Sequence, residues 1–271
     1  CMGLESYREF AQTVVYALFH VVNFNFALDD PYWGVQSIFK PILHFWSLSV
    51  EWQFYLLTPL FLRFLTKSNW AFHIVFITAI SLIGLIVVDD RYSYLTFYGP
   101  HFRFWEYLAG SFVALLHSRT EFGKTKFGLQ LIGLLGLLVS FAVITQVSHP
   151  SWNTIFPVFC TALILVFIHQ ETFINTFLSS RFLRFLGKIS YPVYLWHFPI
   201  LVFYRYFFLS EPSANVTVLL LIGALFFGWF TRIFVEESLW KLRKSDGHCF
   251  FLSQVLAISL ILLVIGMGSK P

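Results

Sequence analysis

Apolar segments of about 20 residues recur along the chain, which is the length that an α-helix needs to cross the hydrocarbon core of a bilayer. The sequence is 58% hydrophobic and 12% charged, so it lacks the polar surface that a soluble globule of 271 residues requires. We therefore predict an all-α fold, a polytopic bundle of about eight or nine transmembrane helices. The expected segments are 10–27, 45–65, 70–88, 101–117, 127–147, 153–169, 189–208, 215–235 and 250–268. His20, Asn23 and Asn25 interrupt the first of them.

Lys and Arg residues are concentrated in every second connection between these segments. The positive-inside rule then predicts a multi-pass protein whose basic connections are cytoplasmic. Residues 1–248 read as one membrane domain, and residues 249–271 as an additional C-terminal transmembrane segment. The chain begins at Cys1 rather than at Met, and we expect it to be a fragment. The net charge of +4 and the absence of a basic helix argue against nucleic acid as a partner.

Polar residues are unusually dense in residues 44–57, HFWSLSVEWQFYLL. A carboxylate at the centre of a membrane helix costs roughly 2.5 to 3.5 kcal/mol, so Glu51 is expected to face protein or water. His44 and Glu51 are seven residues apart and fall on nearly one line of a helix, with Tyr55 one turn further. Two interpretations stay open: the pair lines a cavity for proton transfer or substrate positioning, or Glu51 bonds to neighbouring helices and His44 caps the helix. A second stripe holds Trp46, Ser49 and Gln53, so this helix should be central to the bundle.

Charged residues also occur in the segment 101–117, where Arg103 and Glu106 are three residues apart. This spacing allows an ion pair on one helix surface. The pair either lets the helix seat itself in the membrane or binds an anionic group of a substrate.

A third polar face combines Ser190, Tyr194 and His197, at helical spacing. Pro192 and Pro199 should disturb this helix and free backbone carbonyl groups. His197 is then an acid or base, a donor to a ligand, or a buried histidine satisfied by a freed carbonyl. The sequence contains no Ser-His-Asp order, zinc-ligand spacing or nucleotide-binding glycine loop.

Three stretches together resemble the acyltransferase-3 family of membrane-bound O-acyltransferases, which acetylate lipopolysaccharide O-antigen, peptidoglycan and other surface glycans. They are PILHFWSLSVEWQFYLL (41–57), FRFWEYLAGSFVALL (102–116) and LGKISYPVYLWHFPI (186–200). The first is similar to the family signature HxWSLSVEEQFYL, with Trp52 in place of the second Glu. A weaker fourth match, FVEESLWKLRK (234–244), resembles the VExPxR ending of the family without its proline.

The resemblance implies an enzyme of the bacterial inner membrane that moves an acyl group from cytoplasmic acetyl-CoA, or another acyl-CoA, to a glycan or lipid-linked saccharide outside. It implies no bound cofactor and no metal. Glu51 and His44 would be catalytic, and Arg103, Glu106, Ser190, Tyr194 and His197 would bind substrate. The family's catalytic histidine, on an N-terminal helix, and its SGNH-type domain have no match in this sequence, so we expect the chain alone to be inactive. A transporter or flippase with a polar cavity, or an inert fragment, is the alternative.

Overall fold

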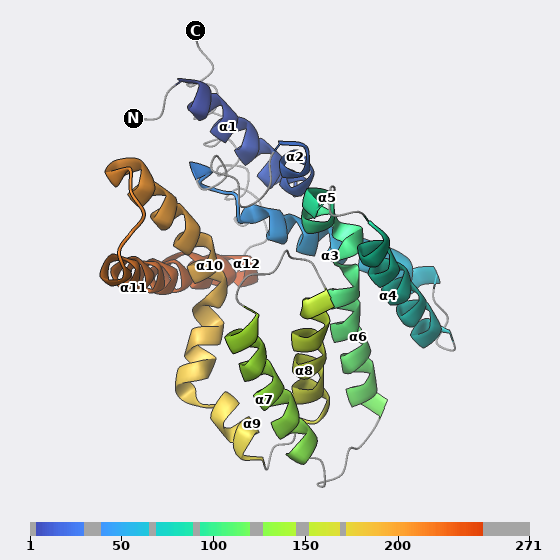
Figure 1. Cartoon of the computed structure of the whole chain (residues 1–271). Coiled ribbons are helices and arrows are strands. Elements are labelled where there is room, and N and C mark those ends of the chain that lie inside the picture. The colour runs from blue at the N-terminus through green and yellow to red at the C-terminus, as the bar shows by residue number, and fades with distance from the viewer. Residues whose placement is uncertain are drawn as a thin grey trace. The chain divides into compact units, whose positions relative to one another are not determined.

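The computed structural model describes residues 4–29, 39–64, 69–88, 93–119, 127–144, 152–168 and 172–245. These residues are folded almost entirely into helices, and no strand occurs among them (Figure 1). The predicted all-α class is therefore confirmed. Segment 250–268 and its assignment as an additional span lie outside the described residues.

Most predicted segments correspond to one helix each. They are α3 (Phe45–Phe64), α4 (Trp70–Val87), α6 (Phe104–Arg119), α7 (Phe127–Val143), α8 (Ile155–Val166), α10 (Arg181–Phe208) and α11 (Ala214–Thr231). The remaining elements are α1 (Leu4–Leu18), α2 (Val22–Asp29), α5 (Ser93–Tyr98), α9 (Phe173–Leu178), α12 (Glu237–Ser245), the short helices η3 (Pro100–Phe102) and η5 (Trp152–Thr154), and the π-helix η6 (Arg232–Glu236). The predicted segment 10–27 is broken as its polar residues suggested, because α1 ends before His20, which has a φ of 53°.

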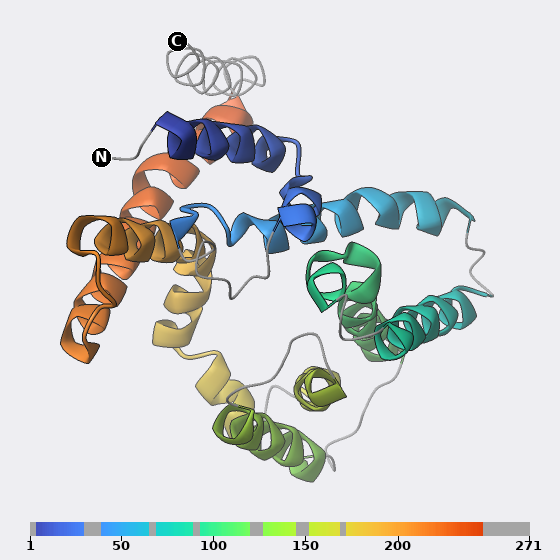
Figure 2. The ribbon, with the colours of Figure 1, turned by 45° about the horizontal axis from the view of Figure 1, so that its top comes forward.

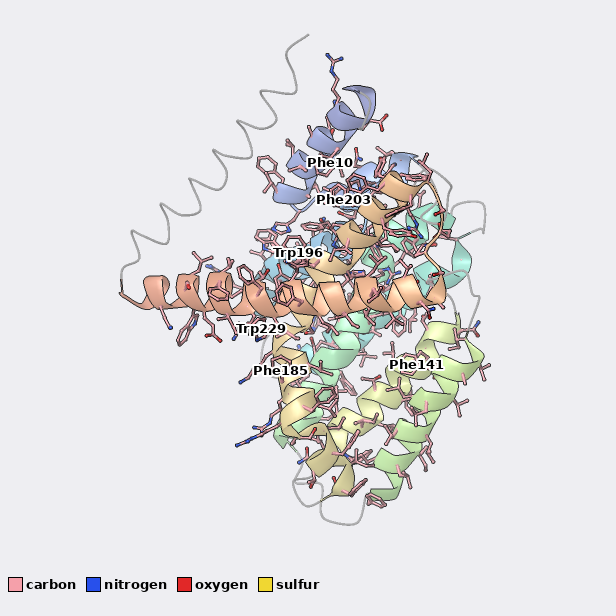
Figure 3. All side chains as sticks on the ribbon, turned by 90° about the vertical axis from the view of Figure 1, so that its left-hand side faces the viewer. Phe10, Phe141, Phe185, Trp196, Phe203 and Trp229 are labelled. Atoms are coloured by element: carbon pink, nitrogen blue, oxygen red, sulfur yellow. The ribbon has the colours of Figure 1, made fainter. Side chains whose placement is uncertain are left out.

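Among the described residues, one helical stretch, Ala214–Lys241, has the length and hydropathy of a membrane span. Four apolar helices are shorter, with 10 to 17 residues. Large apolar side chains are exposed on the helices, including Phe141 and Phe185 in Figure 3, whose exposed fractions are 74% and 44%. The predicted number of eight or so spans stays a prediction.

The chain divides into two compact units. Of the described residues, the first unit contains 4–19, 39–45 and 181–245, and the second contains 20–29, 46–64, 69–88, 93–119, 127–144, 152–168 and 172–180. Each unit is described by itself.

In the first unit, α10 packs against α11, and α11 continues through η6 into α12 as one long rod (Figure 3). Gly228 of α11 lies directly against Val193 of α10, where a side chain would collide with the Val193 backbone. Trp196 of α10 donates its indole N–H to the Thr231 hydroxyl at 2.9 Å, which ties the two helices together.

The two prolines do not end this helix, since α10 runs through both over 28 residues. Proline removes single hydrogen bonds, and packing against α11 holds the remaining turns together.

In the second unit, α7 and α8 lie side by side, as both ribbon views show (Figures 1 and 2). A Cβ atom added to Gly136 would lie 2.6 Å from the Cys160 sulphur, so only glycine allows this approach. Helix α6 packs against both α4 and α8. The Ser81 hydroxyl of α4 donates to the His101 carbonyl at 2.5 Å and accepts from the Trp105 amide at 3.3 Å. These two bonds fix the start of α6, where the charged residues of the candidate site lie.

Candidate functional site

The predicted site residues fall into two groups, one in each unit. The second unit contains what we call the carboxylate cluster: Glu51, Tyr55, Arg103, Glu106 and Tyr107. The first unit contains the histidine cluster: His44, Tyr194, His197 and Phe198. That His44 and Glu51 line one cavity stays a prediction, because they belong to different units.

Glu51 is the first member of the carboxylate cluster. Its carboxylate accepts a hydrogen bond of 2.6 Å from the Tyr55 hydroxyl, one helical turn further along α3. The predicted alignment of these two residues on one helix face is confirmed. A phenol donating to a carboxylate forms a strong, charge-assisted bond, and the second carboxylate oxygen keeps its capacity to accept from a ligand.

Arg103 is the buried charge of this cluster, with 8% of its surface exposed. Its Nη1 lies 3.6 Å from a Glu106 carboxylate oxygen, which confirms the predicted ion pair. Its Nε donates to the Phe97 carbonyl at 2.9 Å, and its guanidinium carbon lies 4.7 Å from the centre of the Trp46 ring. The side chain is therefore held by an anion, a carbonyl and an aromatic face, the partners that make a buried guanidinium tolerable.

Tyr107 is a member that the sequence did not single out. Its ring stacks on Phe54 of α3, with centroids 4.9 Å apart and an angle of 20° between the planes. Its phenol interacts electrostatically with Glu51, Glu106 and Arg103. Tyr107 follows Arg103 by four residues, so helical spacing was the signal that would have placed it on the same face.

The second polar stripe of α3 points into protein, as predicted. Gln53 donates from Nε2 to the His20 carbonyl at 2.7 Å and to the Asn23 side-chain oxygen at 2.9 Å. Asn23 is fully buried and donates in turn to the Tyr98 carbonyl at 3.1 Å. Trp52, which stands where the family signature has a second Glu, stacks on the His20 ring at 4.6 Å. This network sets the rotation of α3 relative to α2 and α5, and therefore the direction in which Glu51 points.

His44 is the centre of the histidine cluster and is 98% buried, with 2% of its surface exposed. It lies in a turn over residues 41–44, immediately before the first residue of α3. Its carbonyl oxygen accepts a 2.7 Å hydrogen bond from the Tyr194 hydroxyl, a contact between residues 150 positions apart. The rings of Tyr194 and His197 lie 5.2 and 5.3 Å from its own ring, centre to centre.

One backbone carbonyl that a proline leaves without a donor, that of Leu195, lies near the histidine cluster. Pro199 has no N–H to donate to the Leu195 carbonyl one turn earlier. The His44 side chain interacts with that carbonyl. The carbonyl that Pro199 leaves without its helical donor therefore lies near His44 rather than His197.

His197 bonds within its own helix. Its Nδ1 lies 2.6 Å from the Tyr194 carbonyl oxygen. A ring nitrogen facing a carbonyl must carry the proton, so in the neutral ring Nε2 is the atom with the free lone pair. His197 is thus satisfied by a backbone carbonyl, as one interpretation expected, but the side chain is half-buried and no proline frees this carbonyl, since the residue four positions after Tyr194 is Phe198. The geometry leaves Nε2 as the chemically active position.

Ser190 is not part of this cluster by hydrogen bonding. Its exposed hydroxyl donates to the Gly187 carbonyl at 2.9 Å, within the same helix. A role for Ser190 in binding substrate stays a prediction. Within the described ranges, no group of three or more His, Cys, Asp or Glu side chains is arranged to hold a metal ion.

Comparison with known proteins finds an acyltransferase family and O-acetyltransferase relatives. The chain matches the family described as an acyltransferase domain over residues 10–233. It is similar to the O-acetyltransferase OatA of Staphylococcus aureus strain NCTC 8325 / PS 47, at 27% identity over 274 residues, covering 90% of this chain and 45% of the relative. The OatA protein of strain MRSA252 is 27% identical over 255 residues, covering 86% of this chain and 41% of the relative. The chain thus spans less than half the length of these curated relatives. No solved structure matches it.

Proposed function

The chain belongs to the acyltransferase family that it matches over residues 10–233. We propose that its function is O-acyl transfer within the membrane. In this proposal an acyl group, acetyl in the simplest case, moves from a cytoplasmic acyl-CoA to a hydroxyl of a glycan outside the bacterial cell membrane. The relatives named O-acetyltransferase support the type of reaction. The apolar stretch Ala214–Lys241 and the exposed phenylalanines support the membrane location.

The observation that carries the proposal is the carboxylate cluster. Two carboxylates, a guanidinium and two phenols lie together in a unit whose exposed side chains are largely aromatic or aliphatic. Ionisable groups in such surroundings are costly unless they are used or paired. Carboxylates accept from sugar hydroxyls, whereas the Arg103 guanidinium and the phenols donate, so the set matches a saccharide chemically.

The reaction needs a base and a path for one proton. The acceptor hydroxyl oxygen attacks the thioester carbonyl carbon, the C–S bond breaks, and the hydroxyl proton ends on a base or on the released thiol. We assign Glu51 and His44 to orienting or deprotonating the reacting groups. Arg103 and Glu106 hold the saccharide or an anionic group on it, and Tyr194, His197 and Ser190 contact the donor.

The test is Glu51→Gln in the protein encoded by the complete coding sequence, with transfer of radiolabelled acetyl from acetyl-CoA to membrane glycan as the readout. We expect transfer to fall about 100-fold or more, the usual range for losing an acid–base group. Glu211→Gln is the matched control, because Glu211 is 64% exposed and pairs with Arg205 outside the cluster. Unaltered transfer by Glu51→Gln at normal expression would remove Glu51 from the mechanism.

The same assay separates the alternative class. A transporter or flippase would move a labelled saccharide or lipid across the membrane without incorporating acetyl. Translocation without acetyl incorporation by the parent protein would refute the acyltransferase proposal.

A further inference from the structure

The first two turns of α10 carry three basic side chains on one face of the helix. Arg181, Arg184 and Lys188 follow one another at steps of three and four residues, so they lie within about 60° of one another around the helix axis. All three are exposed. We call them the basic stripe.

The basic stripe has no counter-charge in the part of the chain that the structure describes. Arg103, Arg205 and Arg232 each form an ion pair with a glutamate, whereas no described carboxylate pairs with the stripe. The sequence contains no acidic residue between positions 172 and 210. Neighbouring members of the stripe are about 5 to 6 Å apart along the axis, within the Debye length of about 8 Å at physiological salt, so their positive fields reinforce one another. The stripe therefore favours an anion from outside these residues.

The length of α10 gives the depth of the stripe in a bilayer. A helix of 28 residues is about 42 Å long, and the hydrocarbon core is about 30 Å thick. The predicted apolar segment 189–208 matches the core, which leaves residues 181–188, about 12 Å of helix, at the level of the lipid head groups. By the positive-inside rule this end of α10 is cytoplasmic.

Exposed aromatic rings accompany the basic stripe. Phe182 and Phe185 lie in the same two turns, and both are exposed. Figure 3 shows Phe185 on the part of α10 beyond its crossing with α11. Rings that enter the edge of the hydrocarbon layer, next to cations that stay among the head groups, are typical of segments that lie in a membrane interface.

An anionic lipid head group is the partner that fits this surface. A phosphodiester supplies one negative charge and acceptor oxygens, to which guanidinium groups donate in pairs. A zwitterionic head group carries its own cation, so it gains less from the stripe. A dissolved phosphate has no acyl chains to cover the exposed rings.

We propose that the basic stripe binds anionic phospholipid head groups of the cytoplasmic leaflet and holds α10 at a fixed depth. The inference rests on the membrane location given under the proposed function and not on the reaction. His197 follows Lys188 by nine residues, about 14 Å along the helix, so the same anchor sets the depth of the histidine cluster.

The experiment is photolabelling of the protein encoded by the complete coding sequence, in phosphatidylcholine nanodiscs. The probe is a trace of phosphatidylglycerol with a diazirine on its head group, and we expect adducts on peptides from the first turns of α10. Each Lys or Arg near an anionic surface contributes about fivefold to binding, so Arg181→Gln/Arg184→Gln/Lys188→Gln should lower this labelling about tenfold or more. The variant Arg181→Lys/Arg184→Lys/Lys188→Arg keeps the three charges and should label like the parent.

A second variant controls for the net charge of the protein. Arg8→Gln/Arg63→Gln/Arg205→Gln removes the same charge from three separate places, on α1, on α3 and at the far end of α10. It should label like the parent. Unchanged labelling of the stripe variant, or an equal loss in either control, would overturn the inference.

Competition separates the sources of phosphate. Unlabelled dioleoyl phosphatidylglycerol should suppress the adducts, and the same excess of coenzyme A, a soluble molecule with phosphate groups, should not. Suppression by coenzyme A would overturn the inference, because the stripe would then bind a soluble ligand. Equal labelling by a probe with a phosphatidylcholine head group would overturn it as well.

Labelling requires no acyl transfer, so the two proposals fail separately. A parent protein that transfers acetyl but gives no adducts on α10 would refute the lipid anchor alone. A parent that is labelled as expected but transfers no acetyl would support the anchor and refute the proposed reaction.

Discussion

Replacing Arg103 with methionine should destabilise the protein strongly, because it leaves the Glu106 carboxylate without its cation. Arg103 is 8% exposed, and the side chain of Glu106 is 25% exposed. Removing one partner of a buried ion pair costs about 3 to 5 kcal/mol, and the partial exposure of Glu106 places the expected loss near the lower figure, about 3 kcal/mol. The lost hydrogen bond to the Phe97 carbonyl is part of this figure and is not added to it.

A second arginine pair in the chain provides the control. Arg205 lies 3.0 Å from Glu211, closer than the 3.6 Å between Arg103 and Glu106, but the Glu211 side chain is 64% exposed. Exposed ion pairs contribute about 0 to 1 kcal/mol, so Arg205→Met should cost no more than that. We expect burial, and not the distance between the charges, to decide which of the two variants loses more stability.

The assay is SDS-induced unfolding of the purified protein from detergent micelles, followed by circular dichroism. The double variant Arg103→Met/Glu106→Gln should be more stable than Arg103→Met alone, because no uncompensated carboxylate remains. A loss for Arg205→Met equal to or larger than that for Arg103→Met would refute the reasoning. A double variant whose loss of unfolding free energy equals the sum of the losses for Arg103→Met alone and Glu106→Gln alone would refute it as well.

Three further predictions concern packing, the buried network and the chemistry. Gly136→Ala should cost about 1 to 3 kcal/mol in unfolding free energy, because its methyl group would meet the thiol of the facing α8 cysteine, whereas Gly128→Ala should not destabilise. Gln53→Leu should cost about 1 to 3 kcal/mol, since it removes a partner of the buried Asn23 side chain, and a loss no larger than that of an exposed substitution would contradict the role of this network. Tyr107→Phe keeps the aromatic stack but removes the phenol, so acetyl transfer should fall about tenfold with unchanged unfolding; equal transfer would exclude the phenol from the site.

Local patterns in the sequence predicted the features that depend on a single helix. The bounds of α3 and α4 follow from apolar length, because only a continuous apolar run can be buried in lipid or packed between helices. Helix α10 begins at Arg181, eight residues before the predicted apolar segment 189–208, because its first two turns mix basic and apolar residues and fall below the hydropathy of a span. Helices α5 and α9 were missed since six residues give no periodic signal.

The candidate site also contains some features that spacing along one helix predicts and others that depend on how helices pack. The Glu51–Tyr55 bond and the Arg103–Glu106 pair were readable from spacing, because residues three or four apart on a helix are neighbours whatever the helix packs against. The placement of Tyr107 near Glu51 depends on which faces of α3 and α6 meet, and spacing within one helix carries no information on that.

By itself the sequence determined the helical class, the approximate bounds of most helices, the local ion pair and the family. The tertiary structure alone decided that Tyr194 bonds to the His44 backbone across 150 residues, and that Gln53 and Asn23 fix the rotation of α3. The physical reason is that hydrophobicity and spacing act along one helix, whereas these contacts depend on the rotation and approach of separate helices, which only their mutual packing sets.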